Sequence, residues 1–135
     1  MEKSTDWILL IDDDPIFIWL AQKMIEKLND KRIVKTFANG EDALIFLKEV
    51  YTPDDSYLVL LDINMPIMNG WDFVDAIIAS EKINENKGNF TIHIVSSSTD
   101  PADQEKAGQW SLVKGYFEKP LELDDMRLIL GHTSA

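Results

Sequence analysis

The sequence predicts an α/β fold in which helices cover both faces of a parallel sheet. Short apolar runs and segments of helical spacing alternate five times along the 135 residues, the order expected when each parallel strand is followed by a helix that packs on it. The runs are apolar throughout rather than alternating, as in strands buried on both faces. The length corresponds to one domain, which we place at residues 1–135 with a core from about 7 to 130.

The first two strand–helix units begin with clear local signals. A continuous apolar run predicts a strand at 7–11, and Asp14-Pro15 then supplies an acidic N-cap with proline at the first helical position. A second strand at 33–37 precedes a helix from Asn39-Gly40 to about residue 49. The first helix runs to residue 28, and the stripe expected to face the core contains Phe17, Leu20, Met24 and Leu28.

The other three units follow the same order, and loops rich in proline, glycine and polar residues separate them. Strands are expected at 57–61, 91–95 and 113–117. Helices are expected from 71 to about 80, from 100 to about 109 and from 123 to 130. The segment 81–89 is expected to be a loop, and Gly131 ends the last helix.

Composition excludes several kinds of chemistry. The chain has no cysteine, which excludes disulfides, thiolate metal ligands and cysteine nucleophiles. Its formal net charge of −11 repels phosphate backbones and disfavours direct nucleic-acid binding. The first residues carry no apolar signal segment, and no apolar run is as long as a membrane span. We therefore expect a cytoplasmic protein that does not bind membranes.

The carboxyl ends of the strands carry the candidate functional residues. Asp12 and Asp13 follow the first strand, Asp62 follows the third, Ser96 the fourth and Lys119 the fifth. Ligands of open α/β sheets bind at this edge. Three carboxylates repel one another unless a cation neutralises them, and such oxygen ligands suit Mg²⁺ beside a phosphate oxygen. The sequence thus predicts a site for a phosphoryl group held next to Mg²⁺.

Each of these residues also has a purely structural interpretation. The turn at 12–15 could be only a helix cap, Ser96 an ordinary loop residue, and Lys119 a solvated lysine. The coincidence of such residues at four strand ends favours a functional site. Four other residues that could bind ligands are expected to have packing or structural roles: Met65, Met68, His93 and His132.

Taken together, the motifs at these strand ends resemble the receiver domains of two-component response regulators. The resemblance extends from Trp7 to about Leu130, nearly the whole chain. The matching segments are 8–15, 60–70, 95–98 and 115–120. The resemblance implies a flavodoxin-like (βα)₅ fold with the strand order 2-1-3-4-5.

The resemblance also implies roles for the acidic residues. Asp62 is the phosphate acceptor, which receives the phosphoryl group from a sensor histidine kinase or a histidine phosphotransfer protein. Mg²⁺ is coordinated by Asp13, Asp62 and the backbone carbonyl of Asn64, with Asp12 bound through water. Phosphoryl transfer needs mainly positioning and charge neutralisation, which these residues supply.

The remaining roles concern the phosphoryl group and the conformational switch. By the resemblance, Lys119 pairs with the phosphoryl group, Ser96 moves to hydrogen-bond it, and Tyr116 swings inward behind Ser96. The peptide bond between Lys119 and Pro120 is usually cis in the family, which directs the lysine into the site. Ser98, like Asn64, flanks the site where family members tune the lifetime of the phosphorylated form.

The resemblance predicts how the protein meets its partners. Because the expected core stripe leaves Ile18 and Trp19 facing outward, we expect them to form part of a kinase-docking patch on the first helix. The chain ends about where a receiver ends, as in a stand-alone, chemotaxis-type receiver or a piece cut from a longer regulator. Its output would then be contact with a downstream protein target, through the fourth helix, fifth strand and fifth helix.

Two other functions are weighed against this one. The acidic run after the first strand also resembles the nucleophile motif of haloacid-dehalogenase-type phosphohydrolases, with Asp12 as nucleophile, but Asp124 and Asp125 lie in the last helix, where they cannot reach the strand ends. A binding module that works without phosphorylation has little reason to keep the acids and the lysine together. We therefore expect a self-phosphorylating receiver, possessing at most autophosphatase activity, rather than a turnover enzyme.

Overall fold

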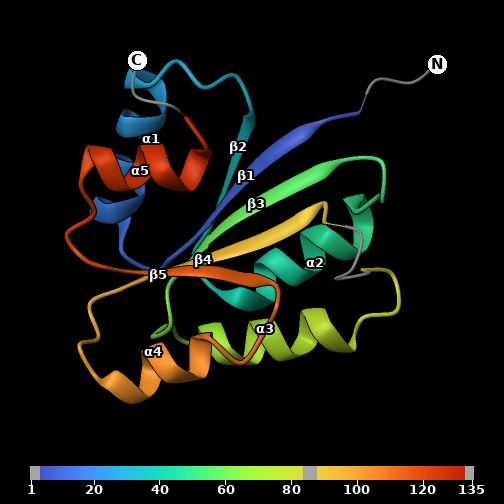
Figure 1. The fold of residues 1–135 in the computed structure, drawn as a ribbon. Helices are drawn as coiled ribbons and strands as arrows, with labels where there is room; N and C mark the ends of the chain where they lie inside the picture. Colours follow the sequence, from blue (N-terminus) through green and yellow to red (C-terminus); the bar gives the residue numbers. More distant parts are fainter. Residues whose placement is uncertain (1–3, 84–87, 133–135) are drawn as a thin grey trace.

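The structure, a computed structural model, describes residues 4–83 and 88–132. Five parallel strands form one sheet in the order β2-β1-β3-β4-β5 (Figure 1). The strands are β1 (Asp6–Ile11), β2 (Ile33–Phe37), β3 (Ser56–Leu61), β4 (Phe90–Ser96) and β5 (Val113–Glu118). The helices are α1 (Pro15–Lys27), α2 (Gly40–Val50), α3 (Gly70–Ala79), α4 (Pro101–Ala107) and α5 (Leu123–Leu130). The predicted flavodoxin-like fold and strand order are confirmed.

The helices form a layer on each face of the sheet. Helices α1 and α5 lie together on one face, and α2, α3 and α4 lie on the other (Figure 1). Element bounds differ from the predicted ones mainly at their ends: α4, for example, stops at Ala107 instead of about residue 109. Part of the predicted loop at 81–89, residues 84–87, lies outside the described residues. No helix within the described ranges is long and apolar enough to cross a membrane.

Side-chain caps explain where the helices begin. The Asp14 carboxylate accepts a hydrogen bond from the Ile16 amide at 3.0 Å, as the predicted N-cap requires. Asn39 and Asn69 cap α2 and α3 in the same way, each accepting from an amide three residues later at 2.8 Å. Gly131 ends α5 with a φ of 76°, in the left-handed region that glycine enters without strain.

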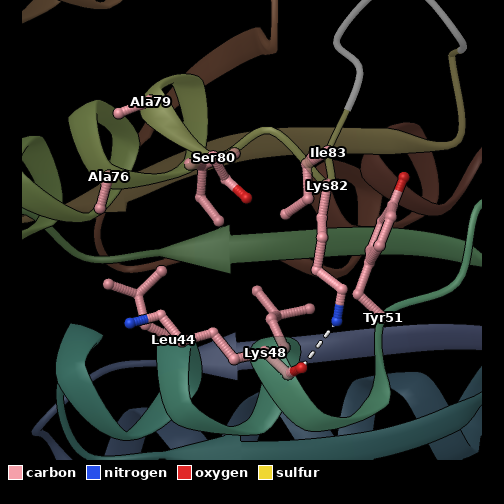
Figure 2. Close-up of a pocket in the computed structure, with 10 residues that line it drawn as sticks. Leu44, Lys48, Tyr51, Ala76, Ala79, Ser80, Lys82 and Ile83 are labelled. Atoms are coloured by element: carbon pink, nitrogen blue, oxygen red, sulfur yellow. Dashed lines mark hydrogen bonds between the residues drawn. The ribbon is translucent and has the colours of Figure 1, made fainter.

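An apolar pocket of about 300 Å³ lies between α2 and α3. Figure 2 shows Leu44 and Lys48 of α2 facing Ala76 and Ala79 of α3, and Ser80 just after that helix, across the pocket. The Lys82 ammonium donates to the backbone carbonyl of Lys48 at 2.8 Å. None of the residues predicted at the strand ends lines this pocket.

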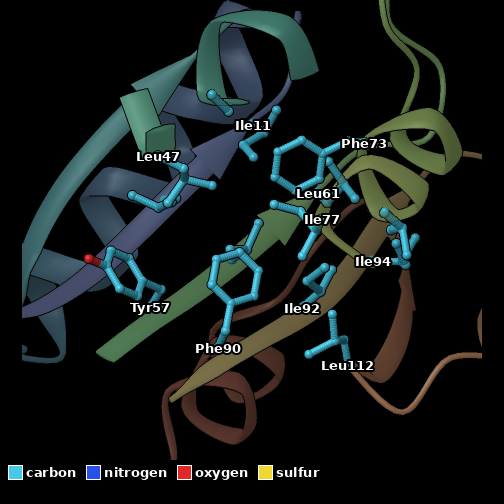
Figure 3. Packing of buried hydrophobic residues seen from close by; sticks show 14 of the residues in the cluster. Ile11, Leu47, Tyr57, Leu61, Phe73, Ile77, Phe90, Ile92, Ile94 and Leu112 are labelled. Atoms are coloured by element: carbon cyan, nitrogen blue, oxygen red, sulfur yellow. The ribbon is translucent and has the colours of Figure 1, made fainter. Parts of the chain in front are cut away.

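Two apolar clusters, one on each face of the sheet, form the core. In β1, the side chains of Ile8 and Leu10 pack under α1 and α5, while Leu9 and Ile11 pack toward α2 and α3. All four are fully buried, as predicted for a central parallel strand. Figure 3 shows the larger cluster, in which aromatic and aliphatic side chains of β3, β4 and α3 interdigitate. The core therefore fixes the strands whose carboxyl ends carry the candidate site.

The buried stripe of α1 differs from the predicted one. Phe17, Ala21 and Ile25 are buried, whereas Leu20, expected in the core, is 42% exposed. The small Ala21 side chain lies at the centre of an i, i+4 series, so the helix turns this series toward the sheet and Leu20 lies on its flank. The partly buried residues beside the stripe are Ile18, Met24 and Leu28.

The observed orientation of α1 contradicts the prediction for Ile18 and agrees with the prediction for Trp19. Ile18 does not face outward as expected, because it packs partly against the cluster beneath α1 and α5. Trp19 is 55% exposed, in line with the prediction. The exposed apolar side chains of α1 are thus Ile16, Trp19 and Leu20.

Candidate functional site

The carboxyl ends of three strands bring four predicted residues together. Asp12 and Asp13 follow β1, Asp62 follows β3 and Lys119 follows β5. The three acids can each offer an oxygen within 4.8 Å of the other two. The Lys119 ammonium lies 2.7 Å from Asp12 Oδ2 and 4.0 Å from Asp62 Oδ2. The Lys119 ammonium therefore pairs with two of the three carboxylates.

Local backbone bonds orient the two buried carboxylates. The Asp14 amide donates to Asp12 Oδ1 at 2.9 Å, and the Ile63 amide donates to Asp62 Oδ1, also at 2.9 Å. The Oδ2 atom of each carboxylate is the one that faces Lys119. Asp12 and Asp62 are buried, while Asp13 is exposed, so the cluster opens to solvent on the Asp13 side.

Burial and crowding disfavour the charged forms of the two buried acids. Desolvation, together with the negative charge of Asp12, raises the pKa of Asp62 to about 6, although the Lys119 ammonium opposes the shift. Desolvation also raises the pKa of Asp12, against the ion pair with Lys119. The excess of negative charge and the all-oxygen donor set fit a hard divalent cation such as Mg²⁺.

An aromatic ring of α1 also contacts the lysine. The Lys119 ammonium lies 4.6 Å from the centroid of the buried Phe17 ring, a distance at which cation–π attraction operates. The apolar spacing of α1 places Phe17 in the core and gives no sign of its contact with Lys119. Apolar spacing shows that a side chain faces inward but not which charged group it meets there. The cis peptide bond expected between Lys119 and Pro120 is present.

The two residues predicted to act as the switch lie on β4, the neighbour of the strand that Asp62 follows, and on β5, the next strand out. Ser96 ends β4 and is fully buried, and its Oγ accepts from the Ser98 amide at 3.2 Å. Tyr116 of β5 is half-buried, and its hydroxyl donates to the Ser98 carbonyl at 3.1 Å. The Lys119 amide donates to the Ser96 carbonyl at 2.8 Å. Tyr116 thus already lies against the loop that follows β4.

The loop between β3 and α3 carries the other predicted ligand. Asn64 lies two residues after Asp62 and is exposed, while Met65 and Met68 pack against the larger cluster, as predicted. Within this loop the Met68 amide donates to the Pro66 carbonyl at 2.7 Å, and Ile67 between them has a φ of 69°. A β-branched residue in this γ-turn is strained.

We expect Ile67→Gly to stabilise the protein. The strain at such a residue costs about 1–3 kcal/mol, and the side chain is 76% exposed, so its removal sacrifices little burial. After the entropy cost of glycine, the expected gain in the free energy of unfolding is about 1 kcal/mol, measured by urea unfolding. Ile67→Ala is the control, since it shortens the side chain but keeps Cβ and the strain. Equal stability of Ile67→Gly and Ile67→Ala would contradict the backbone strain assigned to Ile67.

The remaining predicted residues have structural contacts. His132 Nε2 lies 2.8 Å from Asp30 Oδ2, which ties the end of α5 to the loop before β2. His93 is half-buried beside Phe117, and desolvation lowers its pKa. Asp124 pairs with Arg127, and Asp125 accepts from the Glu122 amide as part of the α5 cap. As expected, the two acids of α5 lie away from the strand ends, so the motif of a phosphohydrolase is not assembled.

Comparison with known proteins agrees with this geometry. Residues 8–130 match the family of response regulator receiver domains. The chain is 34% identical over 128 residues to the nitrate/nitrite response regulator protein NarL of Escherichia coli and 29% identical over 125 residues to the autoinducer 1 sensor kinase/phosphatase LuxN of Vibrio campbellii. These alignments cover 95% and 93% of this chain, but only 54% of NarL and 13% of LuxN.

A solved structure of similar size shows the same fold. The crystal structure of a two-component response regulator from Cytophaga hutchinsonii superposes with a TM-score of 0.77 at 29% identity. The match covers 96% of each chain.

Proposed function

Because this chain belongs to the response regulator receiver domains of two-component signalling, we propose that it accepts a phosphoryl group on Asp62 and signals to a protein partner by changing conformation. Receiver domains are signalling modules rather than turnover enzymes. The observation that carries the proposal is the assembly of three carboxylates and Lys119 at one edge of the sheet.

The proposal includes a Mg²⁺ site. Asp13, Asp62 and the Asn64 carbonyl would hold the ion directly, and Asp12 would hold it through water. Bound there, the ion would neutralise the carboxylates and the negative charge that develops on the transferring phosphoryl group. The fit rests on the donor set, since three carboxylates lie together, two of them are buried, and Lys119 pairs with Asp12 and Asp62.

Asp62 supplies the nucleophile in this proposal. Its Oδ1 accepts from the Ile63 amide, whereas its Oδ2 faces Lys119, and this Oδ2 atom would attack phosphorus while the bond to the donor's imidazole nitrogen breaks. Lys119, 4.0 Å from the same atom, would then contact a phosphoryl oxygen. Cation–π attraction to the Phe17 ring, 4.6 Å from the ammonium, would help to hold the lysine at the site.

The signal would pass through the residues beside Asp62. Ser96 would donate its hydroxyl hydrogen to the phosphoryl group, and Tyr116 would be retained against the loop after β4. The resulting change would bias a two-state equilibrium on the surface formed by α4, β5 and α5. Slow autophosphatase activity belongs to the same proposal, with water as the acceptor of the phosphoryl group.

Incubation with Mg²⁺ and acetyl phosphate, followed by intact-mass measurement, tests this function. We expect a gain of one phosphoryl group, lost in Asp62→Asn and in the presence of EDTA. Absence of the gain with acetyl phosphate and with a panel of phosphorylated kinases would contradict the proposal. Continuous release of phosphate that survives Asp62→Asn but not Asp12→Asn would instead indicate a phosphohydrolase.

We further propose that Trp19, flanked by Ile16 and Leu20, docks the donor, a sensor histidine kinase or histidine phosphotransfer protein. Removal of an exposed aromatic anchor from an interface commonly costs a few kcal/mol of binding. Trp19→Ala is therefore expected to slow phosphotransfer from the kinase by about tenfold or more and to leave phosphorylation by acetyl phosphate unchanged. Ile45→Ala, at a half-exposed position on α2, is the control. An unchanged kinase rate in Trp19→Ala would exclude this docking surface.

A further inference from the structure

Ser98 is the centre of a hydrogen-bond network in the loop between β4 and α4. Its amide donates to Ser96 Oγ at 3.2 Å, and its carbonyl accepts from the Tyr116 hydroxyl at 3.1 Å. Its own hydroxyl donates to Asp103 Oδ2 at 2.5 Å and accepts from the Asp100 amide at 3.3 Å. One residue therefore joins Ser96, Tyr116 and the first turn of α4.

The Asp103 carboxylate is not required to cap α4. Asp100 already caps this helix, because its Oδ1 accepts from the Ala102 amide at 3.0 Å. Asp103 lies three residues after Asp100, and its side chain turns back to the Ser98 hydroxyl instead. A hydrogen bond to a charged acceptor is among the stronger ones in proteins. Asp103 thus restrains Ser98 rather than the helix end.

The restraint on Ser98 determines what the Ser96 hydroxyl can do. A hydroxyl that accepts an amide hydrogen keeps its own hydrogen free to donate. Ser96 is fully buried at the end of β4, next to the strand that Asp62 follows. With Ser98 in place, the Ser96 hydroxyl is prepared as a donor for an anion at the site.

We propose that Asp103 is a positioning residue for the phosphoryl site, which acts through Ser98 on Ser96 and Tyr116. This inference rests on the proposed function, since it concerns the same site. It connects α4 with the phosphoryl site through Ser98 and Ser96: the Asp103 carboxylate is part of the helix, and the network ends at the hydroxyl that would meet the anion. Loss of the carboxylate would leave the acidic cluster intact and impair only the recognition of the anion.

The test compares binding of Mg²⁺ alone with binding of beryllofluoride, a phosphoryl mimic, in the presence of Mg²⁺. In Asp103→Ala and Ser98→Ala we expect the Kd for beryllofluoride to rise by about tenfold, the effect of losing one hydrogen bond to a charged group. The double variant should lose no more than Ser98→Ala, because Ser98→Ala already lacks the bond between Ser98 and Asp103. Asp103→Asn, whose amide oxygen can still accept from Ser98, should restore most of the affinity. The Kd for Mg²⁺ should stay the same in all four, which also shows that they fold.

Asp72→Ala is the matched control. Asp72 occupies the same position after the N-cap of α3 that Asp103 occupies after the N-cap of α4, and it is exposed. An equal loss in Asp72→Ala, or in Asp103→Asn, would mean that only charge matters and would overturn the inference. Wild-type affinity in Asp103→Ala and Ser98→Ala would overturn it as well. A wild-type protein that binds no beryllofluoride would refute the proposed function itself and this inference with it.

Discussion

Asp62→Asn is expected to stabilise the Mg²⁺-free protein at about pH 8 by roughly 2–3 kcal/mol, even though it abolishes phosphorylation. The wild-type pKa of about 6, raised from 3.8 by burial and by Asp12, means that the folded protein holds this carboxylate at a cost above that pH. The amide of asparagine has no charge to desolvate. It can still accept from the Ile63 amide, so the loop keeps its local hydrogen bond.

The sign of the pH dependence follows from the same shift. Between about pH 4 and pH 6 the folded state binds more protons at Asp62 than the unfolded state does, so stability falls as the pH rises through this window. Above this pH window the loss of stability due to Asp62 is complete and no longer changes with pH. Urea unfolding in EDTA across this range should therefore show a decline in the wild-type protein that is smaller in Asp62→Asn, where the raised pKa of Asp12 still contributes.

Added Mg²⁺ should narrow the difference in stability between Asp62→Asn and the wild-type protein. A ligand that binds only the folded state stabilises it in proportion to the logarithm of its concentration over Kd. The wild-type protein should gain stability with Mg²⁺, whereas Asp62→Asn, with one carboxylate fewer, should gain less. Asp72→Asn, which removes an exposed acid outside the cluster, is the control and should behave as wild type. Lower stability of Asp62→Asn than of the wild type in EDTA at about pH 8 would contradict the charge-crowding account.

The strand ends were predictable from the sequence because parallel strands impose their own geometry. An apolar run that stops at an acid, as 7–11 does before Asp12, places that acid at the carboxyl edge of the sheet whatever the exact bounds. The ion pair of Lys119 with Asp12 follows from this edge, since residues far apart in sequence must meet there. Strand order needed the family resemblance in addition, because apolar runs do not show which strands are neighbours.

The orientation of α1 could not be read from the sequence with the same certainty. Two overlapping stripes of helical spacing start at Phe17, one through Leu20 and one through Ala21. Side-chain size favours burial of the stripe through Leu20. Close packing favours the stripe through Ala21, because the small alanine side chain lets the helix approach the sheet. The contact between Phe17 and Lys119 depends on that choice, as does the half-buried position of Ile18.

The network around Ser98 had no sequence signal of its own. A run of serines followed by an Asp-Pro cap is typical of many loops, and the bond from Ser98 to Asp103 depends on how the first turn of α4 is rotated. Hydrogen bonds of this kind are set by tertiary placement rather than by spacing. The family resemblance pointed to the neighbourhood of Ser98 but not to the partner of its hydroxyl.

Gly70→Ala is expected to destabilise the protein by about 3 kcal/mol or more and to weaken Mg²⁺ binding. Gly70 is the first residue of α3, and its amide donates to the Ile63 carbonyl at 2.8 Å. A Cβ at this position would overlap the backbone carbonyl of Asp62 and lie 2.9 Å from the Ile63 Cα. Both neighbours are backbone, so neither can rotate away. Either α3 or the strand end that carries Asp62 must move.

Gly108→Ala separates this clash from the general effect of replacing glycine. At Gly108 the nearest atom to an added Cβ is the Glu105 carbonyl oxygen at 3.5 Å, an ordinary contact, and the φ of −70° suits alanine. This control should equal or slightly exceed the wild-type stability, by up to about 1 kcal/mol. Urea unfolding measures both variants, and a Mg²⁺ titration reports on the Asp62 carboxylate. If Gly70→Ala unfolds like Gly108→Ala and binds Mg²⁺ like the wild type, then the contact between α3 and the Asp62 backbone does not position the site.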